Sequence, residues 1–304
     1  MKQETREVIQ AIMKRVVTTP IPVRWRSAEI MPTGGDRRSF ARGSNGHDIQ
    51  ARVEYEPGDD PRDIDWAATA QTGGQTMYIT QYMEPRDLKV FILADVSPTM
   101  DFGTHRTTKR ILTGELVGSV IKSAAKTHDR VRFLAYNEHD LVVSQRLMPA
   151  QTALFPAVAS LIEADGSRGE EGSGLLKALS ALPRQRSLVF IFSDFLNLNE
   201  PEKRALKRAA LAHDIVCVLV NDLRELVLPD GWGLYSFSDL RSGRRRSIWL
   251  TEKRRKQFAA SSQSRKDELF AFFKEAHCES AAFHTAEGRE ALTRVMRLFG
   301  GHRK

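Results

Sequence analysis

The sequence predicts an α/β protein built on a doubly wound, mostly parallel sheet. Short apolar runs, of which 88–94 and 188–192 are the clearest, show no alternation and stop at polar residues, as strands buried on both faces do. Segments with helical spacing separate these runs, which is the pattern of strand–helix–strand units. A hairpin signal at 137–140 adds one antiparallel edge strand.

Residues 1–86 are predicted to form an N-terminal extension that contains β structure. Apolar residues recur at helical spacing over 5–17, which predicts a short amphipathic helix at the start. Prolines within 20–32 then interrupt regular structure. The β-branched and aromatic residues of 76–82 predict a strand.

Residues 57–66 of this extension combine turn chemistry with charge. Their sequence, Pro-Gly-Asp-Asp-Pro-Arg-Asp-Ile-Asp-Trp, predicts turns whose acids pair with arginines or with local backbone, and a tryptophan that packs the turn onto a sheet. A carboxylate cluster also suits metal binding or acid–base catalysis. However, no histidine or cysteine accompanies the acids, and Arg62 is placed to neutralise them. We therefore predict a structural clamp or docking surface, consisting of Pro57, Gly58, Asp59, Asp60, Arg62, Asp65 and Trp66.

The second predicted domain spans 87–304 and alternates strands with helices. Helices are expected at 106–126, 152–163, 174–181, 200–212, in a long charged segment ending near 276, and at 289–299; further strands are expected at 131–136, 141–143, 215–220 and 280–284. A hairpin is inserted at about 229–250. The glycine-rich stretch 166–174 lacks the lysine of a phosphate-binding loop, so its glycines are expected to serve turns.

Composition limits the classes of function. No apolar run is long enough to span a bilayer and no signal-peptide pattern begins the chain, so a cytoplasmic protein is expected. Cys217 and Cys278 lie in apolar surroundings and suit a reducing compartment. The net charge of +8, concentrated in 241–256, is compatible with solvated faces, and also with nucleic acid, an anionic membrane or an acidic protein as partner.

Two apolar runs deliver oxygen-bearing side chains where they end. Asp95, Ser97 and Thr99 alternate after the first run, and Asp194 closes the second. In open α/β sheets, ligands bind beyond the carboxyl ends of the strands, and hard divalent cations prefer oxygen ligands. The same residues are equally suited to capping the next helix and holding the turn.

The segment 55–66, together with Asp-Val-Ser-Pro-Thr-Met at 95–100 and Phe102-Gly103, closely resembles the DUF58 family, whose core is similar to a von Willebrand factor A domain. The resemblance extends from about residue 34 to the end of the chain. Two departures stand out. Residues 70–72 lack the arginine that the family often has there, and Pro98 and Thr99 replace a small residue and a second serine.

The resemblance implies a metal-ion-dependent adhesion site that binds Mg²⁺ or Mn²⁺. It makes the strands that end at Asp95 and Asp194 neighbours, with the ion bound by hydroxyls and, directly or through water, by the aspartates. The implied ligands are Asp95, Ser97, Thr99, Asp194 and Ser173, the last standing where the family has a threonine. An acidic side chain of a partner completes the coordination, so the implied function is protein binding, without catalysis or a small-molecule substrate.

The resemblance also implies a partner, since DUF58 proteins are commonly linked with MoxR-type AAA+ ATPases. The expected role is an adaptor in the assembly or remodelling of protein complexes, with 57–66 and the basic hairpin as docking surfaces. Two other classes compete with it. One is a metal-dependent phosphoesterase or nuclease that uses Asp59, Asp60, Asp63 or Asp95; the other is an RNA-binding protein that uses its basic surface.

Overall fold

The computed structural model describes residues 3–18, 38–42, 48–55, 61–73, 76–85, 89–104, 107–126, 128–166, 172–238 and 245–286. The chain forms two compact units, of which the larger comprises residues 1–24 and 88–304 and the smaller residues 25–87. The predicted boundary between 86 and 87 lies next to one of these limits. The predicted final helix at 289–299 lies outside the described residues.

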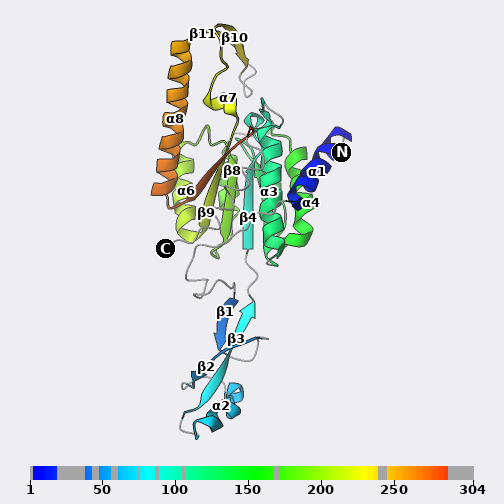
Figure 1. Ribbon diagram of the computed structural model, residues 1–304, viewed down its shortest axis with the longest axis vertical. Helices are drawn as coiled ribbons and strands as arrows, with labels where there is room; N and C mark the ends of the chain where they lie inside the picture. Colours follow the sequence, from blue (N-terminus) through cyan, green and yellow to red (C-terminus); the bar gives the residue numbers. More distant parts are fainter. Residues whose placement is uncertain are drawn as a thin grey trace. The chain divides into compact units, whose positions relative to one another are not determined.

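The larger unit is built on a mixed sheet, as the sequence predicts (Figure 1). Its strands lie in the order β12 (Glu279–His284), β9 (Asp214–Asn221), β8 (Leu188–Ser193), β4 (Lys89–Asp95), β5 (Arg130–Tyr136) and β6 (Leu141–Ser144). Every pairing from β12 to β5 is parallel, and β6 is antiparallel to β5. The short β7 (Met148–Pro149) also pairs antiparallel with β5. The predicted α/β class and the antiparallel edge are therefore confirmed.

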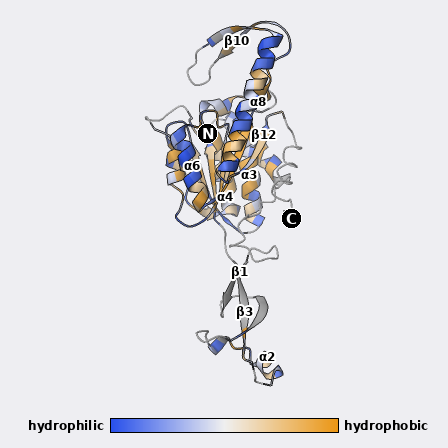
Figure 2. Ribbon diagram, turned by 90° about the vertical axis from the view of Figure 1, so that its left-hand side faces the viewer, coloured by the Kyte–Doolittle hydropathy of each residue, from blue (hydrophilic) through white to orange (hydrophobic). Residues whose placement is uncertain are grey.

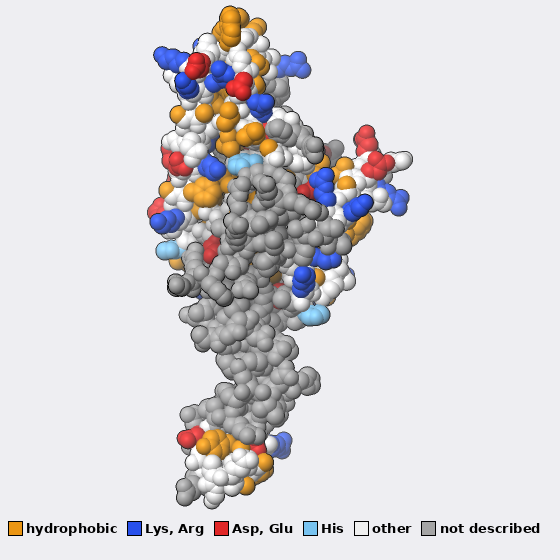
Figure 3. Space-filling view, viewed as in Figure 1, with side chains coloured by type: hydrophobic (Ala, Val, Ile, Leu, Met, Phe, Trp, Pro, Cys, Tyr) orange, Lys and Arg blue, Asp and Glu red, His pale blue; other side chains and the backbone are white. Residues whose placement is uncertain are grey.

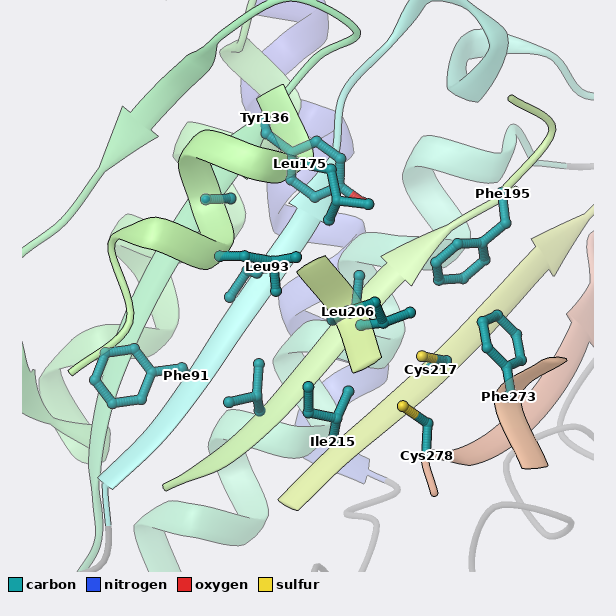
Figure 4. Packing of buried hydrophobic residues seen from close by; sticks show 14 of the residues in the cluster. Phe91, Leu93, Tyr136, Leu175, Phe195, Leu206, Ile215, Cys217, Phe273 and Cys278 are labelled. Atoms are coloured by element: carbon teal, nitrogen blue, oxygen red, sulfur yellow. The ribbon is translucent and has the colours of Figure 1, made fainter. Parts of the chain in front are cut away.

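Helices cover both faces of this sheet. One face carries α3 (Lys109–Lys126) and α4 (Ala150–Glu163), and the other carries α5 (Gly174–Ser180), α6 (Glu200–Ala212) and α8 (Glu252–Glu275). Both faces need this cover because successive side chains of a strand such as β4 point to opposite faces of the sheet, and those of β4 are apolar on both. Phe91 and Leu93 belong to one buried cluster that extends to residues of α5, α6 and α8, with Phe273 at its other end (Figure 4). Cys217 and Cys278 are free, buried thiols in the same cluster.

The N-terminal helix α1 (Gln3–Thr18) belongs to the larger unit, although the sequence groups it with the extension 1–86. Its apolar face explains the difference. Ile9, Ile12 and Val16 are almost completely buried and pack with Val158 of α4. On α3, Gly118 admits this contact, since a Cβ there would lie 2.6 Å from a methyl of Val16. Helical spacing predicts the helix, but not the surface that buries it.

The inserted hairpin follows β9 and the short helix α7 (Leu223–Leu226). Strands β10 (Gly233–Ser238) and β11 (Arg245–Leu250) pair antiparallel and lead directly into α8, whose first turn is capped by the side chain of Thr251. Figure 2 shows that the part of α8 next to the hairpin is strongly hydrophilic.

The smaller unit contains a three-stranded antiparallel sheet of order β1 (Arg38–Arg42), β3 (Tyr78–Pro85) and β2 (Asp48–Glu54). The strand expected at 76–82 is thus confirmed as β3. Between β2 and β3 lie a short 3₁₀ helix, η1 (Pro61–Asp63), and α2 (Trp66–Gln71). Asp65 caps α2 by accepting a hydrogen bond of 3.0 Å from the amide of Ala68.

Candidate functional site

The ends of β4 and β8 lie side by side where the order of the sheet reverses. From β4 the chain proceeds to β5 on one side, and it later returns to β8 on the other. Such a switch point opens a crevice beyond the carboxyl ends of the strands. Asp95 ends β4, and Ser193 and Asp194 end β8, so the sheet brings the two aspartates together.

Asp95 is buried and held by neutral donors. One carboxylate oxygen accepts hydrogen bonds from the amide of Ser97 at 2.8 Å and from its hydroxyl at 2.5 Å. The other accepts a bond of 2.6 Å from the hydroxyl of Ser193. Burial, and secondly the charge of Asp194, raise the pKa of Asp95 to about 6 despite these hydrogen bonds. The carboxylate is therefore costly to ionise in the folded protein.

Asp194, by contrast, has an ammonium partner. The completely buried Lys109 of α3 donates hydrogen bonds to Asp194 at 2.8 Å and to Glu225 of α7 at 2.6 Å. Burial by itself lowers the pKa of Lys109, but the two carboxylates outweigh it and the net shift is upward. This lysine is not among the residues that the sequence predicts to belong to the site. One sequence feature indicates its burial. Lys109 has helical spacing with the buried Leu112 and Leu116, so it lies on the same face of α3.

The turn after β8 is conformationally strained. Phe195 has a φ of 47°, in the left-handed region that bulky residues rarely adopt. Its amide donates to the hydroxyl of Ser193 at 3.0 Å, and its buried ring contacts Phe273 edge to face at 5.1 Å. Figure 4 shows these two rings next to each other. Ring burial and the hydrogen bond therefore fix the direction in which Asp194 leaves its strand.

Ser97 and Thr99 follow β4 at the short 3₁₀ helix η2 (Pro98–Asp101). Within the described segment 89–104, the side chain of Ser97 does not cap η2 but donates to Asp95. Asp95 stabilises the turn by accepting a hydrogen bond from the amide of Ser97. Of the alternative roles considered for these residues, holding the turn is therefore correct. Thr99 is half-buried and lines the same cleft.

A cleft of about 300 Å³ contains four of the five predicted ligands. Its walls include Asp95, Ser97, Thr99 and Asp194. They also include Glu138 and Glu202, and no lysine or arginine is found among the described residues that line it. The lining is therefore rich in acids, with His139 beside them.

Ser173, the fifth predicted ligand, is not among the described residues that line the cleft. Its hydroxyl accepts from the amide of Leu176 at 3.3 Å, which caps α5, and donates to Glu202 at 2.5 Å. The residue that follows Ser173, Gly174, belongs to the glycine-rich stretch and has to be a glycine. A Cβ at Gly174 would lie 2.1 Å from the carbonyl oxygen of Asn137, so only glycine fits this close approach.

The oxygen atoms of this cleft fit a hard divalent cation. The hydroxyl of Ser97 donates its hydrogen bond to Asp95, which leaves the oxygen's lone pairs free to face an ion. Among the described residues, no group of three or more His, Cys, Asp and Glu side chains is placed to hold a metal, so an ion here would depend on hydroxyls. The ligand set stays a prediction.

The second predicted surface, at 57–66, is described only in part, since Pro57, Gly58, Asp59 and Asp60 lie outside the described residues. Arg62 is exposed, and Asp65 serves as the cap of α2. Trp66 is 66% exposed, so the prediction that it packs the turn onto a sheet is wrong. As the first residue of α2, it follows the cap and leaves most of its ring in solvent.

In the part of the chain that the structure describes, no helix combines the length and the apolar character needed to cross a membrane.

Comparisons with known proteins place these features in a family. The chain is 26% identical over 286 residues to "Uncharacterized protein Rv1480" of Mycobacterium tuberculosis, with 89% of this chain and 84% of the relative covered. "Uncharacterized protein Mb1516" of Mycobacterium bovis matches equally.

Among solved structures, BatB from Bacteroides thetaiotaomicron is 14% identical with a TM-score of 0.44, covering 70% of this chain and 97% of that one. An aerotolerance-related membrane protein from Bacteroides fragilis is 15% identical with a TM-score of 0.45, covering 71% and 100%. The family described as "Protein of unknown function DUF58" matches residues 50–268, which is most of the chain. The protein therefore belongs to the DUF58 family.

Proposed function

We propose that this protein is a binding module that captures an acidic side chain of a partner protein through a divalent cation. The observation that carries the proposal is the cleft at the ends of β4 and β8. It combines hydroxyl and carboxylate oxygens, and its described walls have four acids and no lysine or arginine. Such a cleft repels a partner's carboxylate by itself and attracts it once a cation is bound.

Each predicted ligand has a distinct role in this proposal. Ser97 and Thr99 would ligate Mg²⁺ or Mn²⁺ directly, because their hydroxyls are neutral oxygen donors at the cleft wall. Asp95 would orient Ser97 and supply negative charge, and Asp194 would add charge that Lys109 partly neutralises. Ser173 would act only through Glu202. When bound, the cation supplies an open coordination position for the partner's carboxylate.

The family resemblance supports a MoxR-type AAA+ ATPase as the partner, with this protein as its adaptor in assembling or remodelling complexes. A binding site that needs no nucleophile or base suits such a role. The acidic cleft also disfavours RNA as its occupant, because phosphates are repelled by the same carboxylates.

Calorimetry tests the cation site. Mg²⁺ and Mn²⁺ are titrated into EDTA-stripped wild type, Asp95→Asn and the control Asp267→Asn, in which the lost carboxylate lies exposed on α8. Each titration is repeated with acetate, which supplies the missing carboxylate. We expect binding in wild type and control and none in Asp95→Asn. Wild type that binds neither ion, with or without acetate, contradicts the proposal.

A pull-down tests the adaptor role. A purified MoxR-type ATPase from the same organism is passed over immobilised wild type and Asp95→Asn, in Mg²⁺ and in EDTA. Retention is expected only for wild type in Mg²⁺. Equal retention in all four arms would mean that the ATPase docks elsewhere, and no retention in any arm would remove it as the partner.

A further inference from the structure

The inserted hairpin presents an aromatic surface to solvent. Trp232, Leu234 and Trp249, here called the aromatic face, are 79%, 67% and 49% exposed. Leu234 and Trp249 are directly opposed in the β10–β11 register, so their side chains lie on one face of the hairpin. The ring of Trp232 meets that of Trp249 edge to face at 6.2 Å. Solvating so much apolar surface in one place is unfavourable, and it marks an interaction site.

Basic residues lie close to the aromatic face. Arg245 is exposed and lies on the same side of β11, four residues or about 14 Å from Trp249. The guanidinium of Arg254 donates to the carbonyl oxygen of Trp249 at 2.9 Å, which places its charge beside the backbone of Trp249. Across 245–256 the chain carries six Lys and Arg residues and one acid, Glu252. Two of these cations are paired, Arg255 with Asp230 at 3.3 Å and Lys256 with Glu252 at 2.7 Å. Figure 3 shows hydrophobic side chains and Lys or Arg side chains intermixed at this end of the larger unit.

We propose that the aromatic face and its cations form a peripheral anchor that binds the surface of an anionic phospholipid bilayer. Tryptophan is amphipathic, with an apolar ring body and an indole N–H, and it prefers the boundary between lipid and water. Lysine and arginine next to that boundary attract anionic head groups. The combination of two exposed indoles, an exposed leucine and nearby basic residues matches both requirements.

The geometry disfavours single-stranded nucleic acid as the occupant. Successive bases stack on open, roughly parallel ring faces. The planes of Trp232 and Trp249 are inclined by 61°, and the edge of one ring meets the other. Leu234 adds aliphatic surface, which serves a lipid contact but not base stacking. The anchor stands outside the acidic cleft and does not depend on a cation there.

Vesicle co-sedimentation tests the anchor. The full chain is mixed with vesicles of phosphatidylcholine alone or of phosphatidylcholine with phosphatidylglycerol, in EDTA so that the cation cleft plays no part. We expect binding to the anionic vesicles, at least about tenfold weaker binding to the neutral ones, and loss of affinity as salt is raised. Tryptophan emission should shift to shorter wavelength only with the anionic vesicles.

Two matched pairs of variants separate the aromatic and the electrostatic parts. Trp232→Ser/Trp249→Ser is compared with Phe155→Ser/Leu211→Ser, whose targets are also large apolar side chains and are 54% and 78% exposed on α4 and α6. Arg245→Glu/Lys253→Glu is compared with Arg204→Glu/Arg208→Glu on α6, which changes the net charge equally. The tryptophan variant and the Arg245/Lys253 variant should each lose at least about tenfold in affinity for anionic vesicles. Each control variant should lose little.

Several results would overturn the anchor. Wild type that leaves anionic vesicles unbound does so directly, as does a tryptophan variant that binds as well as its control. Tight binding of a single-stranded oligonucleotide without vesicle binding assigns the surface to nucleic acid instead. Because the assay contains EDTA, its outcome is independent of the cation site and of the ATPase partner.

Discussion

The ends of β4 and β8 solve the same electrostatic problem in different ways. Both strands deliver a buried aspartate to one cleft, with Asp95 7% and Asp194 5% exposed. Asp194 is paired with the ammonium of Lys109, whereas the partners of Asp95 among the described residues are the hydroxyls of Ser97 and Ser193 and one amide. The negative charge of the cleft is therefore compensated at β8 and left uncompensated at β4, which is where a cation would gain most.

The compensated end is also the more firmly anchored one. Lys109 connects Asp194 to Glu225 of α7, and Glu225 completes a capping box with Asp222. Asp222 accepts hydrogen bonds from the side chains of Thr104 and Thr285, at 2.6 and 2.5 Å. Burial by itself raises the pKa of Asp222, but these hydrogen bonds and those from backbone amides together outweigh it, and the net shift of its pKa is downward. One polar network thus connects the end of β8 to the base of the hairpin.

The largest expected effect comes from removing the ammonium of this network. Lys109→Met keeps the length of the side chain but leaves Asp194 and Glu225 without their cation. A broken buried ion pair typically costs about 3–5 kcal/mol, because a charge stays buried without compensation. We expect a loss of that size in the free energy of unfolding, measured with urea at neutral pH.

A surface lysine provides the control for Lys109. Lys177 pairs with Asp140 at 2.9 Å, but both side chains are nearly half exposed, at 45% and 44%. Lys177→Met should therefore cost less than about 1 kcal/mol. In Lys109→Met/Asp194→Asn, part of the lost stability should return, since one of the two stranded charges is gone. A cost for Lys109→Met no larger than that for Lys177→Met would show that the network is unimportant.

The sequence predicts the two strand ends but not the ion pair that distinguishes them. The ends of β4 and β8 are local signals, because an apolar run that stops at a polar residue is visible without knowledge of the fold. The partner of Asp194 is not local. Lysines in helices are usually exposed, and the burial of Lys109 depends on α3 lying against the sheet beside β8.

The same limit applies outside the cleft. Helical spacing predicts α1 but assigns it to the extension, because the apolar stripe on α3 and α4 that receives it is formed only in the folded unit. The aromatic of the 57–66 motif is likewise predicted to be packed, whereas Trp66 is mostly in solvent. Residue type shows which side chains are apolar, but neighbouring elements decide which of them are covered.

The second-largest expected effect is a gain in stability, and it depends on pH. Because the pKa of Asp95 rises from 3.8 to about 6 on folding, the folded chain holds a proton that the unfolded chain releases. Folding stability therefore decreases as pH rises from about 4 to about 6, and the full cost, at most about 3 kcal/mol, applies above that window. Asp95→Asn removes the titrating group, so this variant should be more stable than wild type at pH 7 and show no such advantage at pH 4.

Unfolding in urea at several pH values, with EDTA present, measures this difference. Adding Mg²⁺ in excess over the EDTA at pH 7 should then stabilise wild type but not Asp95→Asn, because only the carboxylate gains from the ion. A difference between the two proteins that stays constant from pH 4 to 8 would mean that Asp95 is not the group with the raised pKa. The end of β4 would then carry no electrostatic cost that a bound cation could relieve.

The smallest expected effect distinguishes the two serines among the predicted ligands. Ser97 lies at the cleft wall and donates to Asp95, whereas Ser173 caps α5 and donates to Glu202. Ser97→Ala should therefore weaken Mg²⁺ binding by at least about tenfold, roughly 1.4 kcal/mol, since a neutral ligand and the orientation of Asp95 are lost together. Ser173→Ala should change the affinity by less than about threefold, while losing about 1 kcal/mol of stability as a missing helix cap does. Calorimetry and urea unfolding on both variants separate the two roles, and a larger loss of affinity in Ser173→Ala would place the ion on the α5 side of the cleft, away from the uncompensated strand end.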